Sequence, residues 1–306
     1  MLEQIRCGGK RDIAAALANL ETRPDDLATA QFLDAAFAAP LGFSLGLTGP
    51  PGVGKSTLID AVIRAWRQTG KTIAIIAVDP SSARSGGALL GDRTRLTTDP
   101  GDNGVFIRSM AARDRLGGIA EETYPAMVMM RALFDLVIVE TVGAGQSETA
   151  IADIADVTAF CAQPGSGDAL QYMKAGIMEV PDMVIVTKAD MGQIARRTHA
   201  DLKGALSLGT GQTDIPVISC AATTGEGIDT LLETLSDVAA RISPNFAHIR
   251  AMQLKRWSEN QIRVRFGAMG LEIATNQLVD NSSRGPFCRV LDLKTRLSDA
   301  ITAAFE

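Results

Sequence analysis

A glycine-rich segment with one lysine and two hydroxyl side chains has the composition of a phosphate-binding loop. It fits the pattern GxxxxGK[ST] and consists of Gly49, Pro50, Pro51, Gly52, Val53, Gly54, Lys55, Ser56 and Thr57. The glycines allow backbone N–H groups to surround phosphate oxygens, Lys55 adds a positive charge, and the Ser56 hydroxyl can ligate Mg²⁺. A strand pattern precedes the segment and a helix pattern follows it, so a nucleoside triphosphate site is predicted here.

A later polar segment predicts which base is bound. Thr187, Lys188 and Asp190 fit the pattern [NT]KxD directly after the apolar run DMVIVT. An aspartate here can accept two hydrogen bonds from the N–H groups of guanine, which adenine does not offer, while the lysine stem covers the ring. The same tetrapeptide also fits an ordinary helix N-cap. Its position behind a phosphate-binding loop favours GTP over ATP.

A short loop after the next apolar run is suited to the remaining edge of the base. It consists of Ser219, Cys220, Ala221 and Ala222, at the end of the run PVISC. Its backbone N–H groups could meet the guanine carbonyl oxygen. By itself this loop carries little information, and it gains meaning only from the two preceding patterns.

Three acidic residues are candidates for a magnesium site. Asp79 ends the apolar run TIAIIAV, Glu140 ends FDLVIVE, and Asp92 lies in a glycine-rich segment. The carboxyl ends of parallel strands open into one crevice, so Asp79 and Glu140 should face the terminal phosphates. Mg²⁺ takes few direct protein ligands, and such acids mostly orient its water shell. The alternative is that Asp79 is a turn residue before Pro80 and that Asp92 is solvated.

The elements that must position these residues form an α/β pattern. Short apolar runs alternate with longer helix-compatible segments from residue 43 onward. Near-continuous apolar strands separated by helices predict a P-loop NTPase core of Rossmann type, a mostly parallel sheet with helices on both faces. We expect three parts: an N-terminal helical segment over 1–40, a G domain over 41–243, and a C-terminal helical arm over 244–306. The arm should end in a helix near Asp292 to Ala304.

Composition and charge exclude several classes of protein. The chain has 306 residues, of which 46% are hydrophobic, and a net charge of −5. This composition excludes a disordered chain, and the charge gives no general attraction to nucleic acid or to an anionic membrane. No apolar run reaches membrane-spanning length. The four cysteines form no CxxC pair, so we expect reduced thiols and a cytoplasmic protein.

Together these motifs resemble one family, the MeaB/ArgK-type GTPases. These are G-protein chaperones of adenosylcobalamin-dependent acyl-CoA mutases such as methylmalonyl-CoA mutase. The resemblance runs from GPPGVGKST through VDPSSARSGGALLGDRTR, ETVGAGQSE and QPGSGDALQYMKAGI to TKAD, and so covers residues 49–190. It implies GTP hydrolysis that gates loading of the cofactor into a partner mutase and protects or reactivates that mutase. It also implies a homodimer joined through C-terminal arms.

The resemblance implies roles for particular residues. Asp79, Asp92 and Glu140 match the magnesium-site acids of the family, and residues 163–176 match a loop through which the family senses its mutase. Two segments depart from the family, namely MAARDRLGG and the short C-terminal arm. These departures bear on the mutase partner and on the dimer geometry rather than on GTP hydrolysis.

Catalysis should depend on charge neutralisation rather than covalent chemistry. Lys55, Mg²⁺ and the loop amides should carry a slow basal rate, which a partner mutase stimulates. Gly143 lies three residues after Glu140, where γ-phosphate is sensed in related switches. Gln146 could orient the attacking water or cap the following helix, and both interpretations stay open.

Two other functions use the same loop. A nickel-delivery GTPase for hydrogenase or urease maturation should carry metal ligands, yet the chain has two histidines and no cysteine pair. A P-loop kinase acting on a small molecule would share the phosphate site and Mg²⁺. The TKAD pattern argues against the kinase because it predicts guanine recognition.

Overall fold

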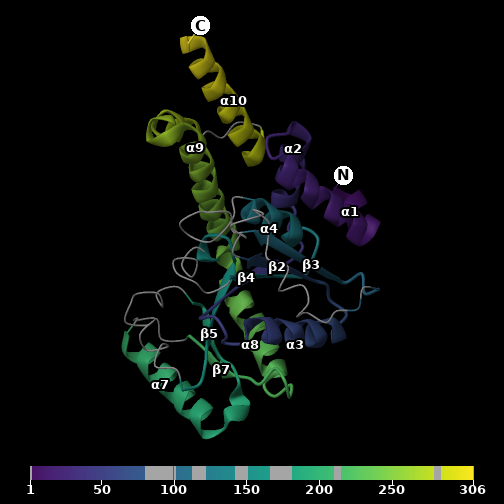
Figure 1. The fold of residues 1–306 in the computed structure, drawn as a ribbon, viewed down its shortest axis with the longest axis vertical. Helices are drawn as coiled ribbons and strands as arrows, with labels where there is room; N and C mark the ends of the chain where they lie inside the picture. The colour runs from purple at the N-terminus through teal and green to yellow at the C-terminus, as the bar shows by residue number, and fades with distance from the viewer. Residues whose placement is uncertain are drawn as a thin grey trace. The chain divides into compact units, whose positions relative to one another are not determined.

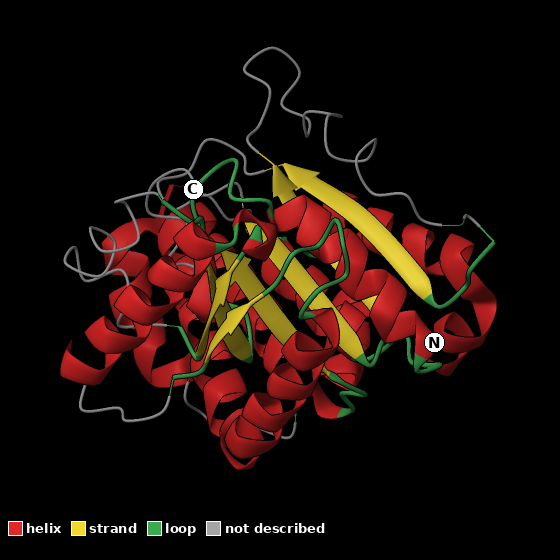
Figure 2. Cartoon of the chain, turned by 90° about the horizontal axis from the view of Figure 1, so that it is seen from below, coloured by secondary structure: helices red, strands yellow, loops and turns green. Residues whose placement is uncertain are grey.

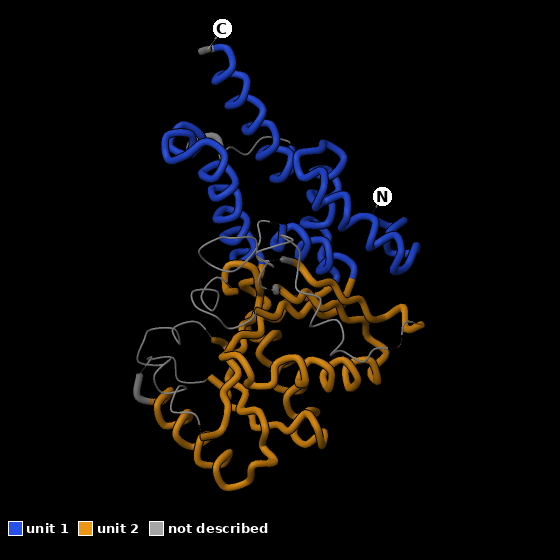
Figure 3. Tube along the Cα trace, in the orientation of Figure 1, with its two compact units in different colours: residues 1–41, 121–133, 247–306 blue, residues 42–120, 134–246 orange. Residues whose placement is uncertain are grey.

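The structure is a computed structural model that describes residues 2–79, 99, 101–111, 122–141, 151–165, 181–209, 215–278 and 284–305. Contacts within the chain divide it into two compact units, which Figure 3 draws in blue and orange. The first, called the helical unit below, holds residues 1–41, 121–133 and 247–306. The second, called the sheet unit, holds residues 42–120 and 134–246.

The sheet unit is built on a parallel sheet (Figures 1 and 2). Its strands are β1 (Phe43–Thr48), β2 (Ile73–Asp79), β3 (Val105–Ala111), β4 (Leu136–Thr141), β5 (Val157–Ala162), β6 (Met183–Val186) and β7 (Val217–Ser219). In the described part of the chain these seven strands lie in the order β3-β2-β4-β1-β5-β6-β7. The α/β fold expected from the alternating pattern is confirmed, and β1 lies at the centre of the sheet.

Helices cover both faces of this sheet. Helices α3 (Lys55–Gln68) and α8 (Ile228–Ile242) pack on one face, and α7 (Gln193–Gly209) packs on the other. Successive side chains along a strand point to opposite faces of the sheet. In β5, Ala159 and Cys161 therefore pack in the apolar cluster with α3 and α8, while Phe160 packs in the cluster with α7. Single 3₁₀ turns are η1 (Ile151–Asp153), η3 (Ala189–Met191) and η4 (Ser243–Asn245).

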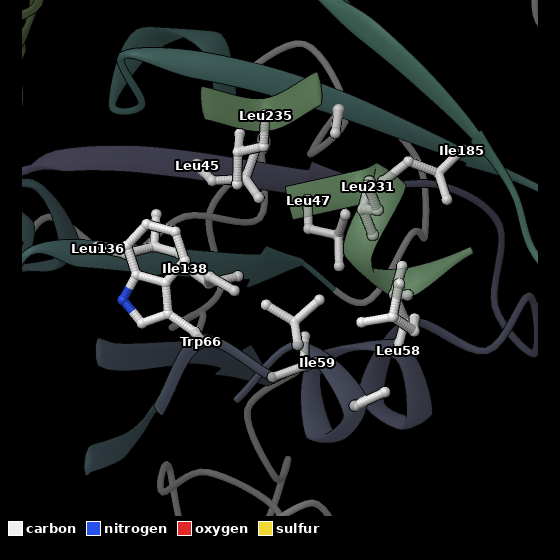
Figure 4. Packing of buried hydrophobic residues seen from close by; sticks show 14 of the residues in the cluster. Leu45, Leu47, Leu58, Ile59, Trp66, Leu136, Ile138, Ile185, Leu231 and Leu235 are labelled. Atoms are coloured by element: carbon white, nitrogen blue, oxygen red, sulfur yellow. The ribbon is translucent and has the colours of Figure 1, made fainter. Parts of the chain in front are cut away.

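The main core of the sheet unit lies between the sheet and the pair α3 and α8. Figure 4 shows Leu58 and Ile59 of α3 and Leu231 and Leu235 of α8 packed with leucines and isoleucines of the central strands, and Trp66 of α3 beside Leu136 and Ile138. The labelled side chains are nearly inaccessible to solvent. Because this apolar layer fixes α3 against β1, it also fixes the loop that joins them.

The amino end of the sheet is held by three similar contacts, which we call the aspartate clasps. In each, an aspartate just before one strand accepts hydrogen bonds from the N–H and hydroxyl groups of a Ser or Thr at the start of the neighbouring strand or directly before it. The pairs are Asp156 with Ser44, Asp135 with Thr72, and Asp182 with Thr158, with donor–acceptor distances of 2.7–3.1 Å. Each hydroxyl accepts the N–H of its aspartate in return. The clasps therefore satisfy polar groups that strand pairing leaves open.

The helical unit contains the two ends of the chain. Its helices are α1 (Leu2–Thr22), α2 (Leu27–Ala38), α4 (Thr123–Arg131), α9 (Phe246–Leu278) and α10 (Pro286–Phe305), with Phe246 itself counted in the sheet unit. Backbone breaks interrupt α1 at Gly9 and α9 at Gly267. The N-terminal and C-terminal helices expected from the sequence are confirmed, but α10 begins earlier than residue 292, where the sequence pattern placed it.

Helix α10 begins early because α2 supplies its N-terminal cap. The Asp34 carboxylate accepts the backbone N–H groups of Phe287 and Cys288 at 2.7 and 3.2 Å. A Cβ on Gly285 would lie only 2.1 Å from Asp34 Cγ, so this approach requires a residue without a side chain. Pro286 then occupies the first helical turn, where no N–H donor is needed.

The division into segments 1–40, 41–243 and 244–306 stays a prediction. In the structure residues 121–133, which lie inside the expected G domain, cluster with the helical unit. Their side chains explain this, since the Tyr124 ring of α4 lies 5.7 Å from the Trp257 ring of α9 and 6.4 Å from the Phe287 ring of α10. None of the helices in the described residues is long and apolar enough to cross a membrane.

Candidate functional site

The loop between β1 and α3 has the backbone that a phosphate cradle needs. Gly49, Gly52 and Gly54 have φ angles of 142°, 75° and 103°, a region that glycine adopts without strain. A Cβ on Gly49 would lie 2.5 Å from the carbonyl oxygen of Cys161. Val53 is fully buried and packs in the main apolar core of the sheet unit. The glycines that the motif requires thus stand where the backbone conformation and close packing exclude other residues.

Lys55 is held inside the loop by backbone oxygens. Its Nζ donates to the carbonyl oxygens of Gly49 at 2.7 Å and Pro50 at 3.1 Å, and the residue is 6% exposed. A buried ammonium group needs such acceptors. Phosphate oxygens are stronger acceptors for it because they are charged. The position therefore suits a lysine that turns towards the outer phosphates of a nucleotide.

Ser56 and Glu140 meet at the carboxyl end of the sheet. The Ser56 hydroxyl donates to Glu140 Oε1 at 3.1 Å, and Glu140 is 8% exposed at the tip of β4, next to β1. A hydroxyl and a buried carboxylate beside a phosphate loop are the hard oxygen donors that Mg²⁺ prefers. These residues fit magnesium, as the sequence predicted, and their role stays a prediction.

Four of the predicted site residues lie wholly or partly outside the described residues. Asp79 ends β2, one strand farther from β1 than Glu140, and its side chain lies outside the described residues. Asp92, Gly143 and Gln146 lie outside them as well. Among the residues that are described, no group of three or more His, Cys, Asp or Glu could hold a metal ion.

The TKAD segment is tied directly to the phosphate loop. The Thr187 hydroxyl donates to the Val53 carbonyl at 2.7 Å, and Lys188 Nζ donates to the Gly52 carbonyl at 3.0 Å. Lys188 also donates to the Gln163 side-chain oxygen at 3.1 Å. Among the described residues other than glycine, Lys188 alone has a positive φ, 52°. Gln163 therefore helps to hold Lys188 across the loop, a contact that the sequence did not predict.

A cavity of about 280 Å³ adjoins these residues. Its walls come from the phosphate loop, α3, the TKAD segment and the loop after β7. The lining residues are Val53, Gly54, Thr57, Leu58, Thr187, Lys188, Asp190, Cys220, Ala222 and Thr223. Asp190 lies exposed at its edge, where it can accept hydrogen bonds from a base. The cavity joins the predicted phosphate and base residues into one site.

Only part of the predicted segment after β7 reaches the cavity. Cys220 and Ala222 line it, together with Thr223, which the sequence did not single out. The Ser219 hydroxyl lies 3.0 Å from His199 Nδ1, and the Ala221 N–H donates to the Glu226 carbonyl at 2.9 Å. The role of the segment in binding a base stays a prediction.

Burial keeps the neighbouring ionisable groups neutral. It raises the pKa of the Cys220 thiol to about 12, so the cavity wall carries no thiolate near neutral pH. Burial, and then the charge of Lys203, lower the pKa of His199 below its ordinary value. The cysteines Cys7, Cys161, Cys220 and Cys288 are all free, as expected. The charged groups at the cavity are therefore Lys188 and Asp190.

Comparison with known proteins identifies relatives of the whole arrangement. Residues 13–268 match the model of the family described as methylmalonyl Co-A mutase-associated GTPase MeaB. A mouse protein named methylmalonic aciduria type A homolog, mitochondrial, is 39% identical over 73% of this chain and 56% of its own length. A putative GTPase of Pyrococcus horikoshii is 39% identical over 78% of this chain and 76% of its own length.

A solved structure supports the fold. The crystal structure of a LAO/AO transport system kinase has a TM-score of 0.67 and 25% identity, and covers 97% of this chain and 96% of its own. The match to the mouse protein is less complete, since this chain spans little more than half the length of that relative.

Proposed function

Because the chain belongs to the MeaB family of methylmalonyl Co-A mutase-associated GTPases, we propose that it hydrolyses GTP to control a cobalamin-dependent acyl-CoA mutase. In this proposal GTP turnover gates the loading of adenosylcobalamin into the mutase and protects or reactivates the loaded enzyme. The observation that carries the nucleotide part is the cavity shared by the phosphate loop, Lys188 and Asp190. The mutase part is supported by the family description.

The chain's own residues supply binding and charge neutralisation. Lys55 would leave the carbonyl oxygens of Gly49 and Pro50 for the β- and γ-phosphates, where it would stabilise charge that develops during hydrolysis. Asp190 would accept the N–H groups of guanine, with the Lys188 stem across the ring. Ala222, whose segment lines the cavity, is the better candidate than Ala221 to offer a backbone N–H to the guanine oxygen.

Magnesium would be held by Ser56 and Glu140, together with Asp79 and Asp92 of the predicted set. Bound there, Mg²⁺ would neutralise charge on the phosphates. Glutamate is one methylene longer than the aspartate of ordinary switch proteins, so Glu140 can reach farther from its strand tip. Without a partner, these groups should give slow turnover. Gly143 would sense the γ-phosphate, and Gln146 is the candidate to orient the attacking water.

We also propose a homodimer through the C-terminal arm, residues 244–306. The last part of α9 carries Met269 and Ile273, which are 74% and 57% exposed. Large apolar side chains at such exposure favour contact with another protein surface. Light scattering coupled to size exclusion should give twice the chain mass, and Met269→Lys with Ile273→Lys should halve it. A monomeric unmodified protein at micromolar concentration would rule the dimer out.

The chaperone proposal is tested with a partner. A cobalamin-dependent mutase should co-purify with the chain, bind in a nucleotide-dependent manner and accelerate GTP hydrolysis. The chain carrying Lys55→Ala should keep the mutase contact but lose the accelerated turnover. If the co-purified mutase left both the GTPase rate and the cofactor loading unchanged, the chaperone function would be refuted. Transfer of phosphate to a small molecule rather than to water would instead identify a kinase.

A further inference from the structure

The helical unit contains a cavity of about 180 Å³ that belongs to no part of the nucleotide site. All of its lining residues belong to that unit: they come from its helices, from the turn between α1 and α2, and from Glu122, which directly precedes α4. Its apolar walls include Leu33 of α2, Trp257 of α9, and Phe287 and Val290 of α10. The rings of Trp257 and Phe287 lie 4.9 Å apart. A cavity of about 150 Å³ with apolar walls is large enough to bind benzene, so this one can take a single substituted ring.

One wall of the cavity carries a buried ammonium group. Lys294 is 8% exposed, and its Nζ donates to Asp25 Oδ1 and to Gln261 Oε1, each at 2.8 Å. An ammonium group has three N–H donors. The described residues thus accept two of them, and Lys294 lines the cavity, where an oxygen atom of a ligand could accept the third. This is the kind of convergent polar group that fixes the orientation of a ligand in an apolar pocket.

The charges around the cavity are balanced. Asp25 is paired with both Lys294 and Arg265, and Glu122 also lines the cavity. Two carboxylates therefore face two cations. Burial by itself would raise the pKa of Asp25, but the bonds and charges of Lys294 and Arg265 lower it, so Asp25 is ionised near neutral pH. An additional carboxylate would enter beside an ionised Asp25, whereas an uncharged acceptor would meet no such repulsion.

From this arrangement we propose that the cavity is a binding site for a small uncharged aromatic molecule with one oxygen acceptor, such as an aryl ketone. The ring lies against Trp257 and Phe287, and the oxygen accepts the third N–H of Lys294. The site is independent of the proposed function, because its residues and its ligand are not those of the nucleotide cavity.

Fluorine NMR on the full chain tests the proposal. The sequence has two tryptophans, Trp66 in the sheet unit and Trp257 in the cavity wall, so labelling with 5-fluorotryptophan gives two signals. Trp66→Phe assigns them. Acetophenone should shift the Trp257 signal saturably and leave the Trp66 signal unchanged. Ethylbenzene, which lacks the acceptor, and benzoate, which is charged, should each bind about tenfold more weakly.

Two variants separate binding from folding. Lys294→Met keeps the stem but removes the donor, and should make acetophenone bind as weakly as ethylbenzene. Ala30→Leu adds volume at a lining residue and should abolish binding of every probe without lowering the thermal midpoint. The proposal is overturned if no probe shifts the Trp257 signal, or if ethylbenzene binds as tightly as acetophenone. It is also overturned if the Trp257 signal shifts when the protein alone is diluted, because that would place a second copy of the chain in the cavity.

Discussion

The two ends of the parallel sheet use polar side chains in opposite ways. At the amino end the aspartate clasps join neighbouring strands, and each hydroxyl donates to its aspartate and accepts from it. At the carboxyl end Lys55 and Lys188 bond to carbonyl oxygens of the loop itself. The polar groups of the clasps thus have all these hydrogen-bond partners within the fold. The two lysines are bonded to carbonyl oxygens, which phosphate oxygens can replace as acceptors.

This difference separates stability from function within one unit. Removal of a clasp should destabilise the fold and leave nucleotide chemistry intact in the molecules that remain folded. Removal of a polar group at the carboxyl end should impair nucleotide binding or hydrolysis and leave the stability of the fold nearly unchanged. The following predictions are ordered by the size of the expected effect.

The largest effect is expected from Lys55→Ala. Loss of the only positive charge inside the phosphate loop should lower GTP turnover by roughly a hundredfold or more, because that charge stabilises the transition state. The thermal midpoint should stay within a few degrees. Steady-state phosphate release and a melting curve measure both. Lys203→Ala, which changes an exposed lysine of the same unit, is the matched control and should alter neither quantity.

Among the three clasps, that of Asp156 with Ser44 should contribute most to the stability of the fold. Asp156 is 2% exposed and Ser44 is fully buried, so Asp156→Ala leaves a buried hydroxyl and N–H without their acceptor. The free energy of unfolding should fall by about 3 kcal/mol. Asp135→Ala in the more exposed clasp should cost less. Urea unfolding measures the difference, and equal losses would mean that burial does not set the strength of the clasps.

Glu140→Gln keeps the size of the side chain and its contact with Ser56 but removes the charge. The Mg²⁺ concentration for half-maximal GTP hydrolysis should rise about tenfold, as for other groups that orient a metal and its waters. A titration of turnover against Mg²⁺ measures this. An unchanged Mg²⁺ dependence would remove Glu140 from the metal site.

The smallest effect is expected from Gln163→Ala. The amide oxygen of Gln163 accepts one bond from Lys188, so its loss should weaken GTP binding about fivefold and change the turnover of bound GTP little. Gln163→Glu, which retains an acceptor, should restore the affinity. The exposed Gln193→Ala is the control. Calorimetry would contradict this positioning role if Gln163→Ala and Gln193→Ala bound GTP equally well.

The sequence motifs predicted where Lys55, Ser56 and Glu140 lie in the fold, because such motifs carry their own geometry. A GxxxxGK[ST] loop has few backbone conformations, so Lys55 and Ser56 could be placed from their spacing alone, and burial of β4 placed Glu140. The contact of Gln163 with Lys188 joins residues from two strands and has no local signal. Of the two predicted alanines, Ala221 bonds to Glu226 and Ala222 lines the cavity, a choice that depends on a turn several residues later.

The clasps and the helical unit were harder to predict. Each clasp joins side chains far apart in the chain, and an aspartate before a strand is also an ordinary turn residue. Residues 121–133 form a helix whose partners, Trp257 and Phe287, come from the other end of the sequence. Periodicity finds such a helix but does not identify the surface against which it packs.

Guanine recognition by Asp190 is the central claim. A substitution that changes which nucleotide is bound tests it most directly. The unmodified chain should bind GTP far more tightly than ATP in calorimetry with Mg²⁺. Asp190→Asn should weaken GTP binding by roughly a hundredfold, since two charge-assisted bonds are lost, and should improve binding of XTP, whose base offers an oxygen to the new amide. Equal affinity of the unmodified chain for GTP and ATP, or unchanged GTP affinity in Asp190→Asn, would contradict the account.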